Sequence, residues 1–409
     1  MRALKYRELK RMVGGMGERA FCTHLKEALE EKHLAPEDIG FRDLWEALYG
    51  REGLDRIDPR KGDMVLEWGG EGAIHSTTFA NITGQLVMSK ILEAYRNPEF
   101  TCTSLVDNIP SRIKDTEVVG GINRLGDKTE VVKEGQNFPH AGFGEDYTTI
   151  PAKVKRGLIV SVTKETIFFD LTGEVLRRAG EVGHSLGIDK EKRIANVIAG
   201  ITNPYNWLGN ALNTYYDPVT SPTAAAATGL AIWINIHGNA LEDWTDIDAA
   251  EQLFARMRDP FTGEPILVTG KRLLVMPQLY NTAKMIVNAT EIRRDNTVQR
   301  TFSQSPIQPY PVEKSEFLYA QCAANGWTTP EYCWWFGDFK KAFGYYENWP
   351  ITVSQAPPSS EAEFNQDIVA RYKASERGVA AVKDPRYILR SCRGIQEDAD
   401  SSSSGEFPR

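Results

Sequence analysis

Residues 116–150 constrain the fold of this chain more than any other stretch. The run EVVGGINRLGDKTEVVKEGQNF, continued by GEDYTTI, contains paired β-prone segments joined by Gly, Asn and Asp, which is typical of a long β-hairpin. Its middle, residues 121–149, has too few apolar residues to build a core of its own. Because an isolated two-stranded hairpin is marginally stable in water, we expect this one to lie on a partner surface.

The bulk composition is that of a globular protein with more than one lobe. At 409 residues the chain exceeds the size at which a single core usually keeps growing. Hydrophobic residues make up 41% and charged residues 25%, an ordinary globular balance. No apolar run approaches the roughly 20 residues of a membrane helix, and the charged N-terminus does not resemble a secretory signal. The net charge of -7 argues against a dedicated nucleic-acid-binding protein.

The cysteines and histidines give no sign of a metal site. Five cysteines stand apart from one another, and no CxxC pair occurs, so we expect a reducing compartment and no disulfide framework. The six histidines are equally scattered, without the spacing of zinc ligands.

The first hundred residues are predicted to contain helices on either side of an extended arm. Residues 1–50 predict two polar helices, and residues 51–72 are rich in Pro, Gly and charge, which indicates the arm. Its WGGEG run at 68–72 lacks the Lys-Ser/Thr of a phosphate-binding loop, so we interpret it as a flexible joint. An apolar stripe predicts a helix over 77–95.

A second, longer helix is predicted over 170–201, after strands in 101–163. Its apolar residues recur at spacings of three and four. Gly173, Gly180, Gly183 and Gly187 each lower helix propensity by about 1 kcal/mol relative to Ala. They therefore indicate close packing or a kink, and we expect a break near Gly187.

The remaining third predicts a buried strand at Leu273–Met276, a turn at Pro277, a following helix and a loop over 297–314. The run EYCWWFGDFKKAFGYYENWPITVSQ predicts two strands. Its aromatic residues are more typical of a core or a subunit contact than of a surface that stacks bases or sugars. The final EDADSSSSGEFPR is a low-complexity tail that we expect to be disordered.

No set of residues predicts catalysis, cofactor binding or metal binding. His184 and His237 lack a nucleophile motif nearby, and the acids from Glu242 to Glu251 lack the order of a calcium loop, so we interpret them as the start of a helix near Asp246. The basic KVKRG run at 153–157 is interpreted as a solvated face or an inter-subunit ion pair. A carbohydrate-active enzyme would need a pair of carboxylates in a cleft, and no pair stands out.

The run FNQDIVARYKASERGVAAVKDPRYIL, residues 364–389, is ordered but carries no chemistry. It predicts a strand, a small-residue turn and a second strand closed by Asp384-Pro385. It resembles the closing segment of tailed-bacteriophage major capsid proteins of the Hong Kong 97 fold. The positions that carry this resemblance are Phe364, Arg371, Glu376, Arg377, Ala380, Val382 and Pro385. The preceding FGDFKKAFGYYENWPITVS resembles the strand pair that comes before that segment in the same family.

The resemblance implies an α+β fold of the Hong Kong 97 type, divided along the chain. Residues 1–75 would form an N-terminal helical segment and arm, and 116–150 the extended hairpin known as the E-loop. Residues 76–115 and 151–200 would form a peripheral domain with a spine helix. Residues 201–391 would form mainly the axial domain, with closing strands shared with the peripheral domain, and 392–409 the tail.

The resemblance also implies a function. The chain would be the major capsid protein of a tailed phage or prophage, assembling with itself as pentamers and hexamers into an icosahedral shell around double-stranded DNA. A portal, a scaffold or a maturation protease would be partners, contacts with DNA would be weak, and no membrane or cofactor would be involved. The protein would not be an enzyme, and it would assemble in the host cytoplasm and reside in the virion.

Two alternatives stay open, an encapsulin-like compartment shell and, more distantly, a carbohydrate-active enzyme. Some family members cross-link subunits through Lys and Asn side chains. Lys128 and Lys133 lie in the predicted hairpin and Asn348 near a strand turn, but no pattern unites them, so we expect no cross-link.

Overall fold

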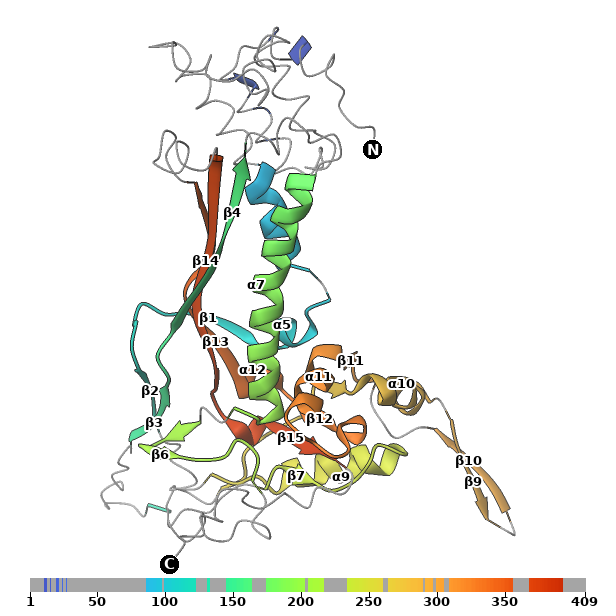
Figure 1. Cartoon of the computed structure of the whole chain (residues 1–409). Coiled ribbons are helices and arrows are strands. Elements are labelled where there is room, and N and C mark those ends of the chain that lie inside the picture. The colour runs from blue at the N-terminus through green and yellow to red at the C-terminus, as the bar shows by residue number, and fades with distance from the viewer. Residues whose placement is uncertain are drawn as a thin grey trace, which may run out of the picture. The chain divides into compact units, whose positions relative to one another are not determined.

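The computed structural model describes well over half of the chain, and this part divides into two compact units (Figure 1). The described residues are 86–97, 99–122, 131–132, 145–163, 174–202, 205–216, 234–259, 264–289, 291–296, 299–304, 309–355 and 368–392, with a few single residues between 11 and 27. Unit 1 comprises Met1–Glu99, Val154–Asp189 and Trp349–Arg377, and unit 2 comprises Phe100–Lys153, Lys190–Asn348 and Gly378–Arg409.

Unit 1 contains two helical segments in close contact. The predicted helix at 77–95 is observed over 86–95, where Leu86, Val87 and Ile91 are fully buried. The long helix α7 spans Glu174–Ala199, and a Cβ added at Gly183 would lie 2.2 Å from the carbonyl oxygen of Ile91. The glycines therefore mark close packing, as expected. The expected break near Gly187 is wrong, because helical packing outweighs the small propensity cost of one glycine.

Three long strands pass through unit 1: β4 (Val154–Thr163), β13 (Phe343–Gln355) and β14 (Ile368–Val382). With β1 (Asp107–Pro110) they form a sheet of order β1-β13-β14-β4. The small-residue turn expected in the closing segment is wrong, because β14 is continuous through it. A Cβ at Gly378 would lie 2.7 Å from the ring of Tyr345, so the strand needs a residue without a side chain beside that ring.

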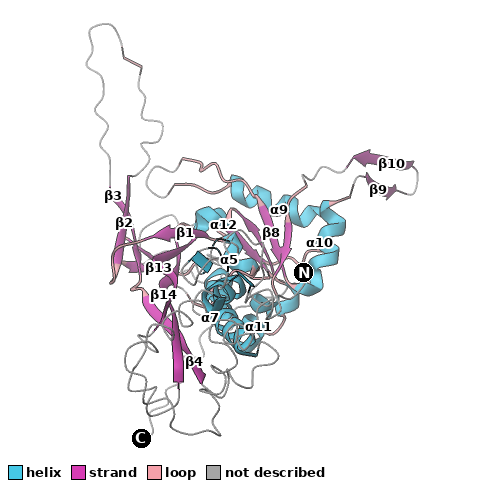
Figure 2. Cartoon of the chain, turned by 90° about the horizontal axis from the view of Figure 1, so that it is seen from above, coloured by secondary structure: helices cyan, strands magenta, loops and turns pink. Residues whose placement is uncertain are grey.

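Unit 2 is built on a five-stranded sheet of order β11-β8-β12-β15-β7 (Figure 2). Its strands are β7 (Ile236–His237), β8 (Arg272–Val275), β11 (Val312–Lys314), β12 (Trp334–Gly337) and β15 (Ile388–Ser391). Helices α9 (Trp244–Ala255), α10 (Tyr280–Val287), α11 (Glu316–Ala324) and α12 (Phe339–Ala342) belong to the same unit. Trp334, Trp335 and Phe336 are fully buried, which confirms that these aromatic residues fill a core.

The closing strand β15 completes the end of the long helix. The Arg390 guanidinium donates to the carbonyl oxygen of Ala199 at 3.1 Å and lies over the rings of Tyr215 and Trp327, at 4.7 and 5.2 Å. The Tyr215 hydroxyl donates to the carbonyl oxygen of Ile198. Gly200, with φ of +82°, lets the chain turn away from the helix. The closing segment thus satisfies helix-end carbonyls that would otherwise be buried without partners.

Several other expectations are corrected by unit 2. Strands were expected throughout 101–163, but helix α5 occupies Thr101–Leu105, where the Glu191 carboxylate accepts hydrogen bonds from the backbone of Cys102 and Thr103 at 2.7 and 2.8 Å. The stretch 297–314, expected as a loop, contains β11 and also β10 (Gln299–Gln304), which pairs with β9 (Glu291–Asn296). This pairing uses polar residues, which carry little apolar periodicity for sequence reasoning to detect.

The expectation of no disulfide is also wrong. Cys333 and Cys392 are joined, with their Cα atoms 4.1 Å apart. They stand one pair beyond Trp334↔Ser391 in the antiparallel register of β12 and β15. Sequence spacing could not show this, because 59 residues separate the two cysteines and strand pairing alone brings them together.

The predicted N-terminal arm, the middle of the hairpin over 123–130 and 133–144, and the tail after 392 lie outside the described residues. Most of the predicted helices within 1–50 also lie outside them.

Candidate functional site

The two strands of the predicted hairpin are present in unit 2. Strand β2 (Glu117–Ile122) pairs antiparallel with β3 (Glu145–Ile150) over six residue pairs, from Glu117↔Ile150 to Ile122↔Glu145. The sheet continues through β5 (Asn206–Trp207) to β6 (Asn210–Ala211). The Trp207 indole donates to the Asp146 carboxylate at 2.5 Å. This small sheet gives the hairpin a base inside the unit.

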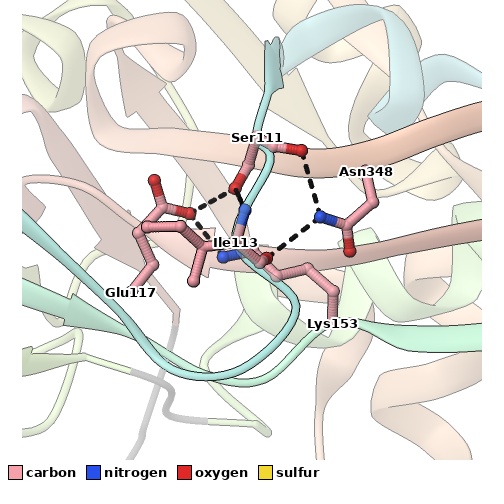
Figure 3. A network of polar contacts seen from close by, with 5 residues as sticks. All are labelled: Ser111, Ile113, Glu117, Lys153 and Asn348. Atoms are coloured by element: carbon pink, nitrogen blue, oxygen red, sulfur yellow. Dashed lines mark hydrogen bonds and ion pairs between the residues drawn. The ribbon is translucent and has the colours of Figure 1, made fainter.

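A polar network holds the root of the hairpin, where the chain enters β2 and leaves β3 (Figure 3). The Lys153 ammonium forms an ion pair with Oε2 of Glu117. The Ser111 hydroxyl donates to the same oxygen at 2.5 Å and accepts from the backbone N–H of Ile113 at 3.2 Å. One carboxylate oxygen therefore ties together the residues before and after the hairpin.

Strand β13 completes this network through Asn348. The Asn348 side-chain amide donates to the carbonyl oxygens of Ser111 and Ile113, each at 3.0 Å (Figure 3). The backbone N–H of Ser111 donates to the carbonyl oxygen of Glu347 at 2.8 Å, and that of Lys153 to Lys114 at 3.2 Å. Both legs of the hairpin are thus fastened to one another, and the first leg is fastened to β13.

The charges of this network are largely shielded from solvent. The Lys153 side chain is fully buried and the Glu117 side chain is 18% exposed. Burial alone would raise the pKa of the Glu117 carboxyl, but hydrogen bonds from Lys153 and Ser111, with the positive charge of Lys153, hold the pKa below its usual value. Glu117 is therefore ionised at neutral pH, and the ion pair is kept in a setting where losing either partner is costly.

Above this root, the hairpin exposes apolar side chains on both of its faces. Val118 is 61% exposed and its neighbour Val119 is 38% exposed. Consecutive residues of a strand point to opposite faces, so neither face of β2 is fully covered by the unit. A root held rigidly and a strand left uncovered are the properties of a hairpin that contacts another molecule.

The structure tests several of the residues considered from the sequence. Asn348 is a structural donor in the hairpin root, while Lys128 and Lys133 lie outside the described residues. Asp246 lies in a capping box with Asp243 at the start of α9, which confirms the interpretation of that acidic run as a helix start. Burial lowers the pKa of His237, and its Nε2 is buried without a hydrogen-bond partner.

Sequence reasoning missed Ser111 and Glu117 and misinterpreted Lys153, which was expected on a solvated face or at a subunit contact. Lys153 is instead buried against a carboxylate 36 residues earlier in the chain. Within the described ranges, no group of His, Cys, Asp and Glu side chains could hold a metal ion. Among the helices described, none has the length and apolar character needed to cross a bilayer.

A family model described as phage capsid protein matches residues 146–391, which is more than half of the chain. The chain belongs to the phage capsid protein family. The match begins in β3 and ends at the last residue of β15, so it includes α7 and the closing segment on which the resemblance was first seen. The expected family is confirmed, and the mixed helices and sheets agree with the expected α+β class.

Solved phage capsids are similar to this chain at low sequence identity. The capsid asymmetric unit of cyanophage Pam1 is 12% identical, with a TM-score of 0.45 over 74% of this chain and 94% of that one. The capsid of a native GTA particle is 12% identical, with a TM-score of 0.44 over 73% and 91%. A structure from Mycobacterium phage Cain is 16% identical, with a TM-score of 0.42 over 72% and 90%. No curated protein matches the sequence.

Proposed function

We propose that this chain is the major capsid protein of a tailed phage or prophage, and that its copies close into an icosahedral shell around double-stranded DNA. Family membership makes it a phage capsid subunit, a component of a particle built from repeated copies. The observation that carries the finer proposal is the hairpin root. A buried ion pair fixes the direction of β2 and β3, while Val118 and Val119 remain open to a neighbour.

The division of labour follows from the same elements. Residues 116–150 act as the E-loop, 76–115 and 151–200 as the peripheral domain with α7 as its spine, and 201–391 mainly as the axial domain. In this arrangement each copy supplies several modest interfaces, which together hold a shell more durably than any one of them. Residues 1–75 form the arm, and 392–409 form the tail.

The proposal extends to partners and place. The subunits assemble in the host cytoplasm, with a portal, a scaffold or a maturation protease, and the protein has no enzymatic activity of its own. The net charge of -7 supports weak, non-specific contacts with packaged DNA, because a strongly basic inner surface would retain it.

Electron microscopy of the purified full-length chain, combined with nucleic-acid analysis of particles from phage-producing cells, tests this proposal. We expect closed shells or rings of five and six subunits, and nuclease-protected double-stranded DNA inside particles from the cells. Shells that contain a protein cargo and no DNA would instead indicate an encapsulin-like compartment. A chain that stays monomeric at high concentration, with and without co-expressed phage head genes, would refute the proposal.

A further inference from the structure

Strand β4 is the outer strand of its sheet, and its side chains are open to solvent. In the sheet order β1-β13-β14-β4, no described strand pairs with its outer edge. Every residue from 154 to 159 is exposed, including Val154 at 51%, Leu158 at 42% and Ile159 at 64%. Because Leu158 and Ile159 are consecutive, they point to opposite faces of the strand, and both faces carry an uncovered apolar side chain.

The inner side of β4 is closely packed, so only the outer edge can accept another strand. A Cβ added at Gly157 would lie 2.6 Å from the carbonyl oxygen of Ala374, which places β4 tightly against β14. An open edge with apolar side chains on both faces is a template for pairing with another chain, and folded proteins normally cover or blunt such an edge.

The charges of this edge indicate what kind of strand would fit it. Lys155 and Arg156 are exposed between the apolar residues, and Arg156 forms an ion pair with Asp189 at 3.4 Å in which both side chains are about 40% exposed. A fitting partner is an extended strand that carries acids and presents apolar side chains on both faces.

The chain itself contains such a segment. Residues 63–68 read DMVLEW, with two acids and four apolar residues, and a glycine stands on either side at positions 62 and 69. In an extended conformation Met64, Leu66 and Trp68 share one face, and Val65 lies on the other, so each face has an apolar contribution. The segment belongs to the predicted arm, outside the described residues.

We propose that residues 63–68 of one subunit add as an extra strand to the outer edge of β4 in a second subunit. This inference rests on the proposed function, since a shell brings many copies together. Main-chain hydrogen bonds then satisfy the open edge, the apolar side chains cover Leu158 and Ile159, and the acids Asp63 and Glu67 meet Lys155 and Arg156.

Cysteine cross-linking in assembled particles tests this pairing. Variants that carry Ile159→Cys together with Val65→Cys, Leu66→Cys or Glu67→Cys are assembled as full-length chains and oxidised. We expect at least one pair to give a ladder of covalent dimers and higher oligomers on a denaturing, non-reducing gel. The control, Leu66→Cys with Met285→Cys, uses a residue of α10 that is 75% exposed and should give no ladder.

The outcomes separate this inference from the proposed function. Wild-type shells with no ladder from any β4 pair, or with only an internal bond in single chains, would overturn the inference and leave the proposed function standing. A wild-type chain that forms no particle would overturn both. Mixed particles, made from copies with Leu66→Cys and copies with Ile159→Cys, should yield covalent dimers, because only a contact between copies can join them.

A charge exchange provides a second, independent test. Reversing Lys155 and Arg156 to Glu should lower particle yield by about tenfold or more, and reversing Asp63 and Glu67 to Lys should do the same. Combining all four reversals should restore most of the yield. A combined variant that assembles no better than either parent, although its unassembled subunits are folded, would contradict the proposed contact.

Discussion

Replacing Lys153 with Met should loosen the root of the hairpin in the unassembled subunit. The Lys153 side chain is fully buried and ion-paired with Glu117, which also accepts a hydrogen bond from Ser111 at 2.5 Å. Methionine keeps most of the side-chain volume but leaves the carboxylate without its cation. Breaking a buried pair in this way costs about 3–5 kcal/mol, and the 18% exposure of Glu117 lowers our expectation to about 2–3 kcal/mol.

Amide hydrogen exchange is the suitable assay, because a two-unit chain of 409 residues need not unfold in one step. A local loss of about 2 kcal/mol corresponds to exchange that is roughly 30-fold faster. We expect this acceleration in peptides that cover β2, β3 and residues 111–116. The control is Lys114→Met, which removes the same charge from an exposed side chain of the same segment and should leave the rates unchanged.

The double variant Lys153→Met/Glu117→Gln separates the ion pair from the rest of the network. We expect it to be less damaged than the sum of the two single variants, with a coupling of about 1–3 kcal/mol. Exchange rates in Lys153→Met that match those of wild type and of Lys114→Met would refute the reasoning that a buried ion pair holds the hairpin root.

Three further predictions concern other described residues. Gly183→Ala should destabilise the unassembled subunit by about 1–3 kcal/mol, because its Cβ meets the Ile91 backbone, whereas Gly180→Ala, whose Cβ would meet only the flexible Lys90 side chain at 3.6 Å, should stabilise it by up to about 1 kcal/mol; thermal unfolding that shifts in the same direction for both would contradict this. Asn348→Asp should speed exchange at residues 111–114 at least as much as Asn348→Ala, since a carboxylate cannot donate to the two carbonyls, and an aspartate variant that exchanges like wild type would count against the role given to this amide. Burial lowers the pKa of His237, so protonation favours the unfolded chain, and its contribution is present above about pH 6.5 and lost as the pH falls through that value; thermal scans from pH 7.5 to 5 should show less pH dependence in His237→Gln than in wild type.

The elements that could be predicted from sequence are those in which local pattern and tertiary packing agree. Strand β8, the turn at Pro277 and helix α10 appear where apolar spacing indicated, and the start of α9 appears where the acids indicated. The aromatic run around Trp334 was expected to fill a core and does so, because large aromatic side chains in a short strand gain most from burial.

The parts that could not be predicted depend on contacts between distant residues. The small residues of the closing segment indicated a turn, but Gly378 is small because Tyr345 packs against it, and Tyr345 is 33 positions earlier in the sequence. The disulfide between Cys333 and Cys392 follows from strand register, which no cysteine spacing encodes. The hairpin root joins Ser111, Glu117, Lys153 and Asn348 from four segments, none of which has a distinctive local pattern.

The central claim is that copies of this chain build a closed shell, and electron microscopy of the purified full-length protein tests it most directly. We predict closed icosahedral particles or rings of five and six subunits, with β2 and β3 of each copy lying on a neighbouring copy. Particles in which these strands contact no neighbour would contradict the assembly role given to the hairpin. A chain that remains monomeric at high concentration, even beside its co-expressed head genes, would contradict the account as a whole.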